Sequence, residues 1–136
     1  MKSYLLNTLL FLGAMVAGAY LNGALISVSG TIIPYPEGVD VTTMPGLAAG
    51  MILWEPKHFL FPFLAHASGT LLSAFIVSKW ATLYAYGQAV SVGLIFFAMG
   101  AIMVWELPSP MWFNVVDLSL AYFPMAALGF WWGAKK

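Results

Sequence analysis

Hydrophobic residues fill four long stretches of the chain, and polar residues gather between them. The apolar stretches cover residues 4–33, 58–78, 83–105 and 111–132. A helix needs about 20 mostly apolar residues to span the hydrocarbon layer of a membrane. Backbone groups find no water there, so each stretch must be helical, and none alternates as a barrel strand does. The sequence predicts an all-α fold: a four-helix membrane bundle that forms one domain over residues 1–136.

The first stretch also has the layout of a signal peptide. Lys2 precedes an apolar core, and Ala17-Gly18-Ala19 has the small residues of a cleavage site. The apolar run continues to Ile33, however, so we expect a retained helix. At about 30 residues, or roughly 45 Å, this helix should tilt or protrude.

The lysines predict the orientation of the bundle. Lys2, Lys79, Lys135 and Lys136 lie on one side of four spans, and Lys57 lies on the other. Because positive residues favour the cytoplasmic side, both termini are predicted to be cytoplasmic. The outer loops carry four acidic residues: Glu37, Asp40, Glu55 and Glu106.

The first outer loop, residues 34–57, is the one with room for function. Thr42 or Thr43 can cap a short helix there, with Pro45 near its first position and its end at about Leu53. The helix is largely apolar, so we expect it to be interfacial, on the bilayer surface or over the bundle.

Composition excludes several classes of protein. The chain is 62% hydrophobic and 7% charged, with no net charge and no arginine, which excludes a nucleic-acid partner. It has no cysteine, which excludes disulfides and thiolate metal sites. His58 and His66 are about 12 Å apart along a helix, too far to share one ion. We therefore predict no metal and no cofactor, and the lipid bilayer as the first partner.

Polar residues inside the spans are the main functional signal, because polar groups in hydrocarbon cost free energy. On the second span His66, Thr70 and Ser73 share an arc of about 100°. Measured from the outer ends, His66 lies about 12 Å deep, Asp117 about 9 Å and Asn22 about 16 Å. Because these polar residues of three spans lie at similar depth, we expect them to converge inside the bundle. The predicted ligand or proton path is formed by His66, Asp117, Asn114, Asn22, Thr70 and Ser73.

A buried histidine and a buried aspartate can each supply the other's counter-charge. A pair of His66 and Asp117 would titrate as a unit and could relay a proton or hold a cation or a polar head group. Glu37 and Asp40 above it could attract cations.

Structural readings of the same residues stay open. His66 can simply bond a neighbouring helix, Asp117 can be solvated or capped by Asn114, and Asn22 can serve helix packing. Glu37 and Asp40 can be solvated turn residues. Small residues at Gly18, Ala65 and Gly69 predict close helix packing.

Three motifs occur in order along the chain: Pro34-x-Pro36-x-Gly38-x-Asp40, Ala65-His66-Ala67-Ser68-Gly69-Thr70 and Pro108-x-Pro110-x-Trp112-Phe113. This order resembles a group of small bacterial four-helix inner-membrane proteins of uncharacterised activity. The resemblance implies a multi-pass protein of the bacterial inner membrane. In that group the position of His66 can hold a non-ionisable residue, which argues against a strictly catalytic histidine.

Three functions follow, and the sequence favours the first. It is a non-enzymatic subunit or oligomer-forming component of a membrane assembly, in line with the small size and many small residues. The second is a translocator of a proton, cation or small solute that uses His66 and Asp117. The third is a lipid-binding protein or an intramembrane enzyme with His66 as base.

Overall fold

The structure is a computed structural model that describes residues 2–134. Lys135 and Lys136, used above to predict orientation, lie outside the described residues. Every regular element within residues 2–134 is helical, and four helical segments are long and apolar enough to cross a membrane. This confirms the all-α, multi-pass prediction. The order is α1 (Lys2–Ile32), α2 (Met44–Met51), the short 3₁₀ helix η1 (Pro56–Phe59), α3 (Leu60–Trp80), α4 (Ala85–Glu106), α5 (Met111–Leu120) and α6 (Phe123–Gly133).

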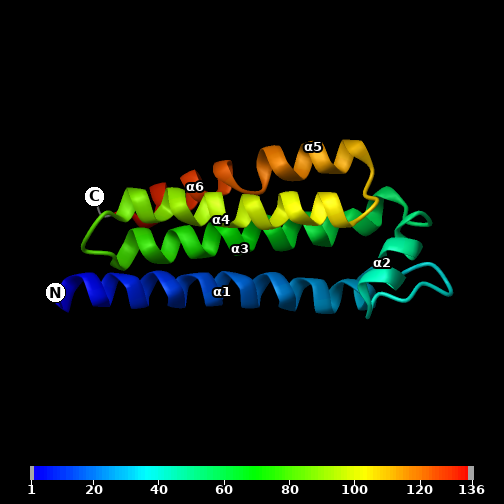
Figure 1. Cartoon of the computed structure of the whole chain (residues 1–136), viewed down its shortest axis with the longest axis horizontal. Coiled ribbons are helices and arrows are strands. Elements are labelled where there is room, and N and C mark those ends of the chain that lie inside the picture. The colour runs from blue at the N-terminus through cyan, green and yellow to red at the C-terminus, as the bar shows by residue number, and fades with distance from the viewer. Residues whose placement is uncertain (1, 135–136) are drawn as a thin grey trace.

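α3 is the central helix of the bundle (Figure 1). α1 packs along one side of it, and α4 and α6 pack on its other faces and against each other. The described ends of the chain lie together at one end of the bundle, and α2 lies at the other (Figure 1).

Glycines let the helices approach α3 closely. Gly18 of α1 meets Gly69 of α3, where an added Cβ on Gly69 would lie 2.8 Å from the carbonyl oxygen of Gly18. Ala65, one turn before Gly69, is fully buried. Gly129 of α6 lies against the backbone of Leu71, with no room for a side chain. These small residues therefore allow α1 and α6 to pack close to the backbone of α3.

The fourth span is broken, which corrects the prediction of one helix over 111–132. α5 ends at Leu120 and α6 begins at Phe123. Pro124 explains the break, because its ring lacks an N–H and would clash with the carbonyl four residues earlier, that of Leu120. The break places Tyr122 at the junction, where its side chain is buried in the bundle.

The loop between α1 and α3 is tied down at its base. Thr43 caps α2 by accepting a hydrogen bond from the Gly46 N–H at 3.2 Å, and α2 ends at Met51, two residues before the predicted end. The hydroxyl of Tyr35 bonds that of Ser29 at 2.6 Å. His58 Nε2 lies 3.1 Å from the carbonyl oxygen of Pro34. These bonds hold both ends of the loop on the bundle.

Asn7 fastens the opposite end. Its Oδ1 accepts the N–H groups of Thr82 and Leu83 at 3.0 and 3.1 Å, and its Nδ2 donates to the Thr82 hydroxyl at 2.9 Å. These backbone N–H groups have no helical partner, because they belong to the turn between α3 and α4. Asn7 therefore joins α1 to that turn, a role that sequence analysis missed.

Candidate functional site

His66 of α3 and Asp117 of α5 are in contact. His66 Nδ1 lies 2.9 Å from Oδ1 and 3.0 Å from Oδ2 of Asp117. Asp117 is 2% exposed, and the His66 side chain is 21% exposed. Asp117 is therefore neither solvated nor capped by Asn114, whose side chain bonds Ser109 in the preceding loop.

Tyr122 completes the cluster, and sequence analysis missed it. Its hydroxyl donates to Asp117 Oδ2 at 2.8 Å and lies 3.1 Å from His66 Nδ1. Gly100 of α4 makes room for the tyrosine, since a Cβ there would overlap the hydroxyl group. A signal for Tyr122 did exist: tyrosines of membrane proteins concentrate at the two interfaces, whereas this one lies mid-span.

The three side chains leave one nitrogen of the cluster free. The carboxylate of Asp117 faces both Tyr122 and His66, so its two oxygens are engaged. His66 uses Nδ1 for these contacts, and no described residue bonds its Nε2. A histidine held through Nδ1 by a carboxylate has a fixed ring orientation, and its Nε2 can donate or accept a bond from a ligand.

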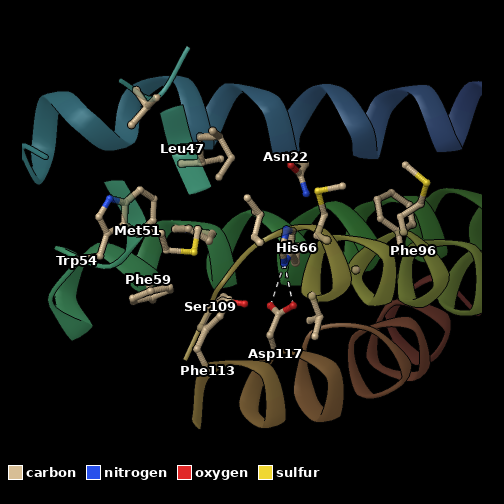
Figure 2. Close-up of a pocket in the computed structure, with 18 of the residues that line it drawn as sticks. Asn22, Leu47, Met51, Trp54, Phe59, His66, Phe96, Ser109, Phe113 and Asp117 are labelled. Atoms are coloured by element: carbon tan, nitrogen blue, oxygen red, sulfur yellow. Dashed lines mark hydrogen bonds and ion pairs between the residues drawn. The ribbon is translucent and has the colours of Figure 1, made fainter. Parts of the chain in front are cut away.

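A cavity of about 780 Å³ lies beside the cluster. His66, Asp117 and Tyr122 form part of its wall, and the side chain of Asn22 points into it from α1 (Figure 2). The rest of the wall is mainly apolar and comes from α1, α4, α5 and the loop that holds α2. Examples are Met15, Leu47, Met51, Trp54, Phe96 and Met99. An apolar cavity of this size with a few polar groups is typical of a small-molecule site.

Part of the cavity lies between α1 and α4. α1 packs mainly against α3 and has little contact with α4. Ile26 of α1 and Ile95 and Met99 of α4 line the cavity, and their side chains are exposed. In a membrane the surface beside the middle of α1 and α4 faces hydrocarbon.

No protein-family model, curated protein or solved structure matches the chain. The resemblance to small bacterial four-helix membrane proteins thus stays a prediction.

The remaining residues of the predicted path serve the fold. The Thr70 hydroxyl donates to the His66 carbonyl oxygen at 2.8 Å, within α3. The Ser73 hydroxyl donates to the carbonyl oxygen of Ala14 at 2.8 Å and joins α3 to α1. Neither side chain lines the cavity, whereas Asn22 does.

The two loop residues expected to attract cations, Glu37 and Asp40, do not line the cavity beside the cluster. Glu37 is exposed. Asp40 accepts hydrogen bonds from the hydroxyl and N–H of Thr42, at 2.6 and 2.8 Å, and from the Thr43 hydroxyl. These bonds stabilise the carboxylate and lower the pKa of Asp40 below its ordinary value, the Thr42 hydroxyl having the largest effect. Asp40 thus organises the turn before α2.

Proposed function

We propose that this chain is an integral membrane protein that binds a lipid-like molecule in the cavity between α1 and α4. One observation carries the proposal: an apolar cavity between two helices that make little contact with each other has a buried polar cluster in its wall. The ligand enters from the bilayer, its apolar part contacts the methionines and aromatic residues, and its polar group meets His66.

The position of the cavity favours binding over translocation. The cavity occupies the half of the bundle nearer α2. Beyond it the centre is filled by packed apolar side chains such as Ala74, Val77 and Val92, all fully buried. Ser73, at the same depth, is bonded to backbone. A translocator needs polar groups or water along the whole path, and these packed apolar side chains interrupt such a path.

A role as a subunit or oligomer-forming component is an alternative proposal. It was favoured by small residues on the helices, but Gly18, Gly69 and Gly129 pack inside the chain. Its remaining support is the small size of the chain, 14.8 kDa, and Gly13 of α1, which is exposed and has no neighbour within 4 Å of an added Cβ. Native mass spectrometry of the protein extracted from its membrane tests both proposals.

Filling the cavity should displace the ligand. Ala19 lines the cavity on α1, and Ala24 lies on the same helix, exposed and outside the cavity. We expect native mass spectra of protein extracted gently from its membrane to show a bound lipid-like mass. Ala19→Phe should weaken this adduct at least about tenfold, equal to about 1.4 kcal/mol. Ala24→Phe should leave it unchanged.

Two results would contradict the lipid-binding proposal. One is a spectrum with no bound mass at all, and the other is equal loss of the adduct in both variants. A mass that contains other protein chains would instead support the subunit proposal.

We further propose that the protein spans a bacterial inner membrane with both termini in the cytoplasm. α2 then lies at the opposite, non-cytoplasmic face of that membrane. The placement of the lysines supports cytoplasmic termini, and the apolar sequence of α2 supports its place at the membrane surface. The motif resemblance supports a bacterial inner membrane. Lys2 and Lys79 lie near one end of the bundle, while Lys57 and Glu55 lie at the α2 end, 3.0 Å apart.

Because the chain has no cysteine, single cysteines can test this topology without background. Glu37 is exposed at the α2 end, and Ser3 is exposed at the beginning of α1. We expect a membrane-impermeant maleimide to label Glu37→Cys in intact cells, and Ser3→Cys only after the membrane is opened. The reverse pattern would overturn the proposed orientation.

A further inference from the structure

Two uncommitted polar groups face the cavity from different helices. His66 Nε2 has no partner among the described residues, and the amide of Asn22 makes no hydrogen bond to any of them either. Asn22 is half-buried and points from α1 into the cavity that His66 borders from α3 (Figure 2). Unpaired polar groups at membrane depth cost free energy, so a polar group of the ligand is expected between them.

The charges around the cavity exclude an anionic head group. The chain has no arginine, and none of the lysines within residues 2–134 lines the cavity. Asp117 is the acidic residue in the wall, and Tyr122 and His66 already occupy its oxygens. A carboxylate or phosphate would lose its water, would meet no cation other than a His66 already paired with Asp117, and would lie near that carboxylate.

An uncharged oxygen fits both free groups. As an ion pair with Asp117, His66 presents an N–H at Nε2, and as a neutral imidazole bonded through Nδ1 it presents a lone pair. The Asn22 amide offers both a donor and an acceptor. A hydroxyl group matches the cluster in either state, and a carbonyl oxygen matches the ion pair.

We propose that the ligand is an uncharged lipid with a hydroxyl or carbonyl oxygen, which bonds His66 Nε2 and the Asn22 amide. This proposal rests on the proposed function, because it names the chemical class of the molecule that the cavity holds. The oxygen is the recognition point, and the alkyl part of the ligand extends along the methionines and aromatic residues of the wall.

Four probes with the same chain length separate the head groups. The purified protein in detergent is titrated with hexadecanol, 2-hexadecanone, hexadecanoate and hexadecane, and affinity is measured from the rise in Tm. We expect hexadecanol to bind about tenfold more tightly than hexadecane or hexadecanoate, a difference of about 1.4 kcal/mol, because its hydroxyl group bonds His66 and Asn22. 2-Hexadecanone shows whether the site prefers a hydroxyl or a carbonyl oxygen. Binding as tight as that of hexadecanol indicates that the site accepts a carbonyl oxygen, and weaker binding indicates that it requires a hydroxyl group.

Asn22→Leu is the decisive variant. It keeps the volume of the side chain and breaks no hydrogen bond of the described structure, so the variant should fold. We expect about a tenfold loss of hexadecanol affinity with hexadecane unchanged. Ser27→Ala is the control, since Ser27 also lines the cavity from α1 but its hydroxyl already bonds the Gly23 carbonyl oxygen at 2.8 Å.

The outcomes separate the two proposals. If all four probes bind equally, or if Asn22→Leu leaves hexadecanol binding unchanged, the head-group proposal is wrong while the lipid site stands. Preferred binding of hexadecanoate also overturns the head-group proposal. If no probe binds, both proposals are overturned.

Discussion

Replacing Gly129 by alanine is expected to destabilise the protein by about 3 kcal/mol, at the upper end of what overpacking a core usually costs. The added Cβ would lie 2.5 Å from the Leu71 carbonyl oxygen and 2.9 Å from the Phe75 nitrogen. Both are backbone atoms of α3, which cannot rotate away as a side chain can. The helices must therefore separate, and α6 loses its packing on α3.

Gly13→Ala is the matched control. Gly13 also lies inside a helix, but nothing comes within 4 Å of its added Cβ. Alanine there should be neutral or stabilising by about 1 kcal/mol, because it favours the helix more than glycine does. Reversible unfolding in mixed detergent micelles measures both. Equal effects of the two substitutions would show that the Gly129 contact does not hold the bundle.

Replacing Asp117 by leucine is expected to cost about 3 kcal/mol, since unsatisfied buried groups typically cost 1–3 kcal/mol each. The substitution removes the acceptor of both the Tyr122 hydroxyl and His66 Nδ1. Tyr122 is 1% exposed, so water does not replace the lost bond, and His66 Nδ1 at 3.1 Å is the one partner left to its hydroxyl among the described residues. The same unfolding measurement records the loss.

A triple variant provides the test of this cause. Adding His66→Leu and Tyr122→Phe to Asp117→Leu removes the orphaned groups together, and a matched apolar cluster can be as stable as the polar one. We expect the triple variant to recover most of the lost stability. Ser119→Ala, an exposed position on the same helix, should change nothing. A triple variant weaker than Asp117→Leu would contradict the hydrogen-bond explanation.

The sequence predicted those features that depend on local patterns along the chain. Span lengths predicted the four crossings, and helical periodicity with depth predicted that His66 and Asp117 could meet. Thr43 and Pro45 predicted the beginning of α2 by the same local logic of helix caps. Each of these inferences depends on residues close to one another in the chain, or on distance from the end of a span.

The rest depends on contacts between elements, which no local pattern contains. Tyr122 reaches Asp117 because the chain breaks before Pro124, and a continuous helix would turn the tyrosine elsewhere. Asn7 bonds a turn that lies 75 residues away. The gap between α1 and α4 arises because both helices pack on α3, so sequence alone could not predict the cavity.

The docking of α1 has a consequence for membrane insertion. α1 is made before its main packing partner, α3, which begins at Leu60. Until then α1 must stand alone in the bilayer, which its apolar sequence allows. Gly18 then contacts Gly69 of α3, and Asn7 bonds the turn after α3. A shift of α1 along α3 by one helical turn, about 5.4 Å, would break both contacts. α1 thus enters the membrane before the helix that positions it, and only one register accepts it.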